Sequence, residues 1–126
     1  MNLKRILLVE DDTEDQFLFN HALDCIKLGA FCKAFTNGQE ALDHLNHTTD
    51  YEIIFLDLNM PVMTGVECLK ILKENEKYKK IPVVIITTSL NPSELNHCME
   101  LGALKIFHKP NTFPELCNGL NDILMN

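Results

Sequence analysis

The sequence lacks several features that mark particular protein classes. It has no tryptophan, and five glycines and five prolines in 126 residues are too few for a linker or a low-complexity segment. Five cysteines are present, but they lie far apart, form no C-x-x-C pair and are odd in number, which is typical of reduced thiols rather than a disulfide framework. We therefore expect each cysteine to be a small buried apolar residue.

Positive charge is also scarce. The 11 lysines and arginines stand against 18 acids, and the formal net charge is -7. This balance argues against direct binding of nucleic acid or anionic lipid. The apolar run nearest the amino terminus, Ile6 to Val9, is too short for a signal peptide or a membrane span. We expect no membrane insertion and a cytoplasmic location.

The sequence does have enough apolar residues for one core. Hydrophobic residues make up 46% of the chain, and 126 residues suit one domain of ordinary size better than two. No internal repeat or linker marks a boundary within the chain. We interpret residues 1–126 as a single domain.

Apolar runs alternate with segments of helical spacing. The runs predict strands at Arg5–Val9, Phe31–Phe35, Ile53–Leu56, Val83–Thr87 and Leu104–Phe107. Each helical segment opens with a capping signature, in which a short polar residue precedes an acid or amide by three positions. These signatures are Thr13/Gln16, Asn37/Glu40, Thr64/Glu67, Asn91/Glu94 and Thr112/Glu115.

The spacing within the helical segments supports the same interpretation. Leu18, Ala22 and Ile26 form an apolar stripe in the first of them. Gly29 and Gly102 stand where helix ends favour a residue with positive φ. Five strand–helix units indicate an α/β fold of the (βα)5 type, a doubly wound parallel sheet with helices on both faces.

Chemically reactive side chains gather where the predicted strands end. Glu10 and Asp11 follow the first strand, Asp57 ends the third, Thr87 ends the fourth and Lys109 follows the fifth. Ligands of such sheets bind outside the carboxyl ends of the strands. Three carboxylates in one cleft repel one another unless a cation joins them, and Mg2+ suits a site with few protein ligands.

This set of residues fits reversible phosphorylation of an aspartate. A carboxylate beside bound Mg2+ can attack a phosphoryl group when cationic and hydroxyl groups hold the transferred oxygens. Lys109 offers the ammonium group and Thr87 the hydroxyl.

Four motifs, LLVEDD, FLDLNMPVMTG, VVIITTS and HKP, resemble those of the receiver domain of bacterial two-component response regulators. The resemblance covers essentially the whole chain. It implies a flavodoxin-like sheet of strand order 2-1-3-4-5. It implies the following site roles: Asp57 as phospho-acceptor, Glu10, Asp11 and the backbone carbonyl of Asn59 as Mg2+ contacts, Thr87 as switch hydroxyl, Lys109 as phosphate contact, and a cis Lys109–Pro110 peptide.

The resemblance also implies partners. A sensor histidine kinase or phosphotransfer protein would donate the phosphoryl group, and the domain would support only its own phosphorylation and slow autodephosphorylation. Because no chain follows Asn126, we expect a stand-alone receiver whose output is protein–protein interaction through its fourth helix, fifth strand and fifth helix. Two positions depart from the family pattern: Ile106 replaces an aromatic switch residue, and Thr88 replaces a small alanine.

Other interpretations stay open at this stage. An aspartate-nucleophile phosphohydrolase would use similar groups, although it usually carries D-x-D where this chain has Asp57, Leu58 and Asn59. An FMN carrier would need a phosphate loop where the acids stand, and a degenerate receiver would act only as a binding module. We interpret three further acids as helix-start charges without a site role: Asp12, Glu14 and Asp15.

Overall fold

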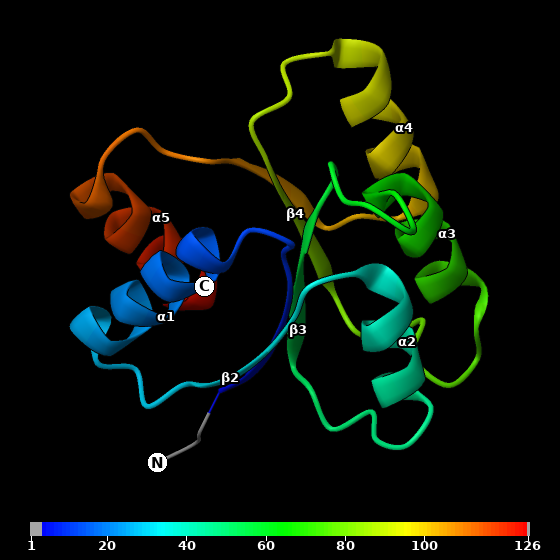
Figure 1. Cartoon of the computed structure of the whole chain (residues 1–126), viewed down its shortest axis with the longest axis horizontal. Coiled ribbons are helices and arrows are strands. Elements are labelled where there is room, and N and C mark those ends of the chain that lie inside the picture. The colour runs from blue at the N-terminus through cyan, green and yellow to red at the C-terminus, as the bar shows by residue number, and fades with distance from the viewer. Residues whose placement is uncertain (1–3, 126) are drawn as a thin grey trace.

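The structure is a computed structural model, and it describes residues 4–125. Five strands and five helices alternate along the chain (Figure 1). The strands are β1 Arg5–Val9, β2 Phe31–Phe35, β3 Ile53–Asp57, β4 Val83–Thr87 and β5 Lys105–His108. The helices are α1 Thr13–Ile26, α2 Gly38–Leu45, α3 Gly65–Glu74, α4 Pro92–Leu101 and α5 Phe113–Met125. The predicted alternation is confirmed, although β3 extends one residue further, to Asp57, and the last strand is shifted by one residue.

The strands form one parallel sheet in the order β2-β1-β3-β4-β5. This confirms the predicted fold and strand order. Helices α1 and α5 cover one face, and α2, α3 and α4 cover the other (Figure 1). In this strand order β1 lies between β2 and β3, so the carboxyl ends of β1 and β3 lie side by side.

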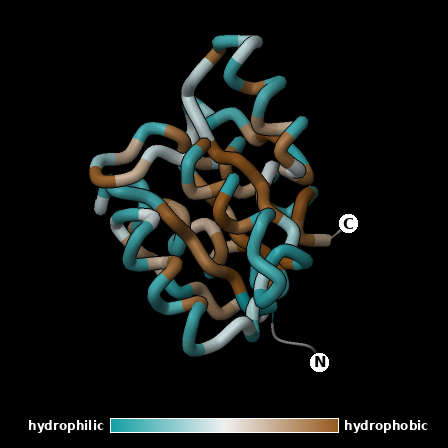
Figure 2. The backbone as a smooth tube through the Cα atoms, turned by 90° about the vertical axis from the view of Figure 1, so that its right-hand side faces the viewer, coloured by the Kyte–Doolittle hydropathy of each residue, from teal (hydrophilic) through white to brown (hydrophobic). Residues whose placement is uncertain are grey.

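Both faces of the sheet are buried under helices. Along β1, the side chains of Ile6 and Leu8 lie in the core between the sheet and helices α1 and α5. Those of Leu7 and Val9 lie in the core between the sheet and helices α2 and α3. This alternation follows from the two-residue repeat of a strand. Burying each of these side chains contributes about 1.5–3 kcal/mol, and Figure 2 shows the resulting hydrophobic centre. The charged residues at the carboxyl ends of the strands are therefore attached to a well-packed core.

Helix capping matches the predicted signatures at four of the five helices. Asn37 and Asn91 cap α2 and α4, Thr64 forms a complete capping box with Glu67, and Thr112 accepts a hydrogen bond from the backbone N–H of Glu115. The prediction for α1 is wrong, because Asp12 caps this helix by accepting from the N–H groups of Glu14 and Asp15. The Asp12 carboxylate, one residue earlier than Thr13, already satisfies those donors.

Helix ends and cysteines require two corrections. Gly102 ends α4 with φ 111 as predicted, whereas α1 ends at Lys27 with φ 55 and Gly29 follows in the loop. The prediction that every cysteine is buried holds for Cys68 and Cys98 and is wrong for Cys25, which is exposed on α1. Cys32 and Cys117 are half-buried. Residue type alone does not fix which side of a helix a thiol occupies.

The helices of residues 4–125 are all too short or too polar to cross a bilayer. The cytoplasmic location stays a prediction.

Candidate functional site

Three carboxylates meet at the carboxyl edge of the sheet. Strand β1 pairs with β3 so that Val9 lies opposite Leu56, which brings the following residues, Glu10 and Asp57, side by side. One ligand atom each of Glu10, Asp11 and Asp57 lies within 4.8 Å of the other two. Glu10 and Asp57 are buried, whereas Asp11 is exposed. The strand register thus assembles the predicted acidic cluster.

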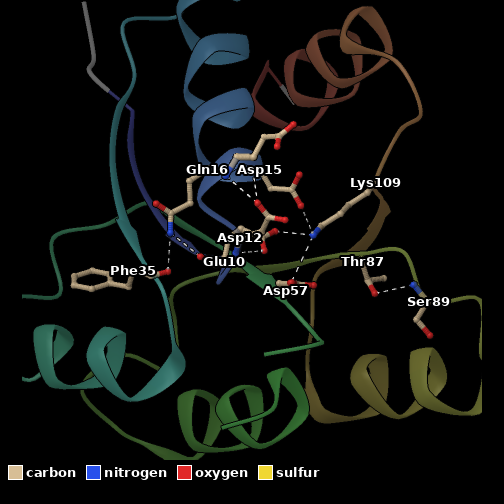
Figure 3. A network of polar contacts seen from close by, with 10 residues as sticks. Glu10, Asp12, Asp15, Gln16, Phe35, Asp57, Thr87, Ser89 and Lys109 are labelled. Carbon is tan, nitrogen blue, oxygen red and sulfur yellow. Dashed lines mark hydrogen bonds and ion pairs between the residues drawn. The ribbon is translucent and has the colours of Figure 1, made fainter. Parts of the chain in front are cut away.

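Lys109 lies at the centre of these acids (Figure 3). Its Nζ is 2.7 Å from Glu10 Oε1, 3.0 Å from Asp15 Oδ2 and 3.5 Å from Asp57 Oδ2. The backbone N–H of Lys109 donates to the carbonyl of Thr87 at 2.8 Å, which fixes the chain just after β5. The ammonium group is therefore shared among carboxylates from three segments of the chain.

Asp15 is a site residue that the sequence analysis missed. We interpreted it as a helix-start charge, and it does lie in the first turn of α1, but its carboxylate also hydrogen-bonds Lys109 Nζ. The signal that could have found it is its position one turn after the β1 acids, at the same edge of the sheet as Lys109.

Gln16 was also missed, and it fixes the loop after β1. Its side-chain amide donates to the backbone carbonyl of Glu10 at 2.6 Å. The N–H of Glu10 in turn donates to the carbonyl of Phe35 at 2.9 Å, and the N–H of Asp12 donates to Glu10 Oε2 at 3.2 Å. Figure 3 shows these bonds around Glu10. The Glu10 carboxylate is thereby held in one orientation.

Burial shifts the protonation of the acids. It raises the pKa of Glu10 to about 7, an effect that the hydrogen bond from Lys109 opposes and the charge of Asp57 reinforces. Burial likewise raises the pKa of Asp57, against the lowering effect of the Lys109 charge. For Lys109, burial alone would lower the pKa, but hydrogen bonds to Glu10 and Asp15 raise it. The lysine therefore stays charged, and the buried acids bind a proton more readily than exposed ones.

Gly65 allows the loop after β3 to turn back beneath Asp57. Its N–H donates to the carbonyl of Leu58 at 2.8 Å. A Cβ atom at this position would collide with the carbonyl oxygen of Asp57 and with the Cα atom of Leu58, both of them backbone atoms. Only glycine fits this close approach, so the T-G pair that ends the motif FLDLNMPVMTG has a steric role that we did not predict.

An open cleft of about 520 Å³ adjoins the acids and is lined by Asp11, Asn59, Met60 and Thr64 among others. Asn59 is exposed, and its backbone lowers the pKa of Asp57, in opposition to the effect of burial. Oxygen ligands from three carboxylates suit a hard divalent cation such as Mg2+. Glu10, Asp11 and Asp57 therefore form an acidic cluster that could hold a metal ion.

Thr87 ends β4 and is fully buried. Its Oγ1 accepts a hydrogen bond of 3.0 Å from the N–H of Ser89, as Figure 3 shows. Ile106, on the neighbouring strand β5, packs half-buried against the core. The predicted cis peptide at Lys109–Pro110 is wrong, because every peptide bond of residues 4–125 is trans. An X–Pro bond prefers trans by only about 0.5–1 kcal/mol, so the HKP motif by itself does not fix the isomer.

Comparisons with known proteins agree with this geometry. A family model described as the response regulator receiver domain matches residues 6–121. The two-component response regulator ORR11 of Oryza sativa subsp. indica is 35% identical over 105 residues, which covers 83% of this chain and 70% of that protein.

Two solved structures are similar over almost the whole chain. The phosphorylated cyanobacterial phytochrome response regulator RcpA has 28% identity and a TM-score of 0.88, with 99% of this chain and 96% of that chain covered. The Mn(2+)-bound form of response regulator Rcp1 has 31% identity and a TM-score of 0.84, with 95% and 91% covered.

Proposed function

Because this chain belongs to the response regulator receiver domain family, it is a signalling module of a two-component system rather than an enzyme, and we propose that Asp57 is its phospho-acceptor. Membership in a two-component system implies a histidine kinase as partner. One observation carries the assignment: the Asp57 carboxylate lies both within the acidic cluster and 3.5 Å from the Lys109 ammonium group. A phosphoryl group on Asp57 would lie between the Lys109 ammonium group and a metal ion held by the acidic cluster.

The contacts of Glu10 and Asp11 favour Asp57 over these neighbours. Glu10 is bound more tightly by Lys109, at 2.7 Å, and also accepts the N–H of Asp12, so its carboxylate is held in place and is less free to attack phosphorus. Asp11 is exposed and is not among the acids bonded to Lys109. Asp57 has the longest contact with Lys109 and lies next to Leu58 and Asn59, which line the open cleft.

Phosphoryl transfer would then use the chain's own groups as follows. An oxygen of Asp57 attacks the phosphorus of a phosphohistidine, the P–N bond breaks as the P–O bond forms, and the imidazole leaves. Lys109 Nζ turns from Asp57 Oδ2 to the transferred oxygens, while Glu10 and Asp15 keep it in place. The Thr87 hydroxyl, whose oxygen accepts from the Ser89 N–H, would donate its own proton to a phosphoryl oxygen.

Glu10, Asp11 and Asp57 would hold Mg2+, with the backbone carbonyl of Asn59 as a further contact. A bound divalent cation would neutralise the charge that develops on the phosphoryl oxygens. The cluster geometry supports this assignment, and the related Rcp1 was solved with Mn(2+) bound.

The output of the switch would be protein–protein interaction. Thr87 lies at the end of β4, beside β5, so a movement of its hydroxyl would reach α4, β5 and α5. Phosphorylation would bias an equilibrium between two arrangements of this face. We further propose that the whole chain, residues 1–126, acts as one receiver unit whose output partner binds there.

The test is phosphorylation by a small donor. Incubation with Mg2+ and acetyl phosphate should add one phosphoryl mass to the wild-type chain and none to Asp57→Asn. Asp43→Asn, at an exposed acid on α2, is the matched control and should be modified like wild type. A phosphoryl group that persists on Asp57→Asn would refute the assigned acceptor, and repeated turnover of small phosphate esters would favour a phosphohydrolase.

A further inference from the structure

Helices α1 and α5 pack against each other on one face of the sheet (Figure 1). Each follows a parallel strand and leads away from the carboxyl edge, so both helices run from the site toward the opposite edge. The ring of His21, in the second half of α1, stacks on the ring of Phe113, at the start of α5, with centroids 5.0 Å apart. This contact sets the register between the two helices.

One helical turn further along, the facing residues are both cysteines. Cys25 follows His21 by four residues, and Cys117 follows Phe113 by four residues, so each thiol lies on the same helix face as the stacked ring before it. The electrostatics agree, since burial first and then the charge of Cys25 raise the pKa of Cys117. Two thiols from distant parts of the chain thus lie next to each other at the α1–α5 interface.

We propose that Cys25 and Cys117 are a modification site, at which mild oxidation forms a reversible disulfide that joins α1 to α5. With hydrogen peroxide as oxidant, the Cys25 thiol is converted to a sulfenic acid and one water is released. The Cys117 sulfur then attacks the Cys25 sulfur, the S–O bond breaks, and a second water leaves. Two thiols lose two electrons and two hydrogens, and a dithiol reductant reverses the reaction.

The positions of the other three cysteines single out this pair. Cys68 and Cys98 are buried in the layer on the opposite face of the sheet. Cys32 lies half-buried on β2, the strand at one edge of the sheet, and so belongs to neither helix of the pair. Cys25 is the exposed cysteine of residues 4–125, and Cys117 is the partly exposed thiol that faces it.

The disulfide would act on the frame of the site without touching its chemistry. Helix α1, one of the two helices that the disulfide would join, carries Asp15 in its first turn. Asp15 binds Lys109, which lies in the segment that leads into α5. A Cys25–Cys117 disulfide would hold the two helices together even when the ion pair between Asp15 and Lys109 opens. The proposal does not depend on phosphorylation, because its readouts concern only thiols and stability.

The experiment treats the full chain with a small excess of hydrogen peroxide and counts thiols by alkylation and mass spectrometry. We expect a monomer that is lighter by two hydrogen atoms, with Cys25 and Cys117 both protected and joined in peptide mapping. A disulfide that closes so long a loop should raise the thermal midpoint by roughly 10 °C, and dithiothreitol should reverse the shift.

The variants separate the pair from the other cysteines. Cys25→Ser changes an exposed residue and should fold normally but lose both the mass change and the midpoint shift. Cys117→Ala repeats the test from the other partner, and Cys32→Ser is the matched control that keeps the disulfide. A link from Cys25 to Cys32, a dimer joined through Cys25, or oxidation of Cys25 to sulfinic acid without a link would each overturn the proposal.

Discussion

The carboxyl edge of the sheet holds two unlike groups of side chains. The charged group consists of Glu10, Asp11, Asp15, Asp57 and Lys109, and its contacts join residues as far apart as Asp15 and Lys109. The neutral group consists of Thr87, Ser89 and Ile106, and its side-chain hydrogen bond spans two residues, from the Ser89 N–H to the Thr87 hydroxyl.

The two groups differ in the free energy that is lost when one of their contacts is broken. Removing one buried partner of an ion pair leaves other charges without compensation, whereas losing a neutral hydrogen bond costs only about 1 kcal/mol. The charged group is therefore suited to hold a phosphoryl group and a cation. The neutral group can change partners cheaply, which suits a switch.

The largest effect should come from removing the central cation. In Lys109→Met, three carboxylates lose their shared ammonium group, and we expect phosphorylation by acetyl phosphate to slow by about hundredfold or more. Stopped-time mass spectrometry measures the rate. Lys105→Met, at an exposed lysine on β5, is the control and should retain the wild-type rate. Equal rates in both variants would mean that Lys109 holds the fold and not the phosphoryl group.

The next effect tests the backbone beneath the charged group. Gly65→Ala forces a methyl group against the backbone of Asp57 and Leu58, so we expect a loss of about 2–3 kcal/mol in the free energy of unfolding. Urea titration measures it. Gly38→Ala is the matched control, because Gly38 also begins a helix but its added methyl group would meet the sulfur atoms of Cys68 and Met63 at 3.1 Å. Similar losses in both variants would contradict the special role of Gly65.

A third prediction concerns pH. The folded-state pKa of Glu10 is about 7, above its ordinary value of 4.5, so its contribution to stability is present below pH 4.5 and is lost as the pH rises through 7. Mg2+ must displace this proton, so its affinity should fall about tenfold per pH unit below pH 7 and level off above it. Calorimetric titration of Mg2+ at several pH values measures the slope, and Glu10→Gln should flatten it. A slope that survives in Glu10→Gln would assign the proton to another group.

The smallest effect should come from the neutral group. Thr87→Val removes the acceptor of the Ser89 N–H and should lower the free energy of unfolding by about 1 kcal/mol. Phosphorylation of Asp57 should change by less than about tenfold, since Thr87 is not among the groups paired with Lys109 Nζ. Thr87→Ser keeps the hydroxyl and should restore both values. A hundredfold loss in Thr87→Val would place Thr87 with the charged group instead.

The sequence alone predicted the parts of the site that depend on chain topology. Five apolar runs fixed five parallel strands, and the ends of such strands share one edge, which is why Glu10 and Asp57 were expected to meet. The expectation held because β1 and β3 are buried on both faces and tolerate no shift in register.

The sequence did not predict the details that depend on three-dimensional competition between similar groups. Asp12 rather than Thr13 caps α1, and Asp15 binds Lys109, because side-chain direction within the first turn decides which acid faces the cleft. The predictions of a cis Lys109–Pro110 bond and of a buried Cys25 were also wrong. Neighbours in space, absent from any local pattern, determine these outcomes.

The strand order also has a consequence for the newly made polypeptide. A ribosome delivers β1 and β3 early, and these two strands lie side by side, so Glu10 and Asp57 can approach each other while Lys109 is still unsynthesised. A domain generally folds as one unit, so the acids stay unpaired with Lys109 until the segment after β5 has emerged. Docking of β5 is thus the step that neutralises the acids, and a nascent chain acquires its finished pocket only with its last strand.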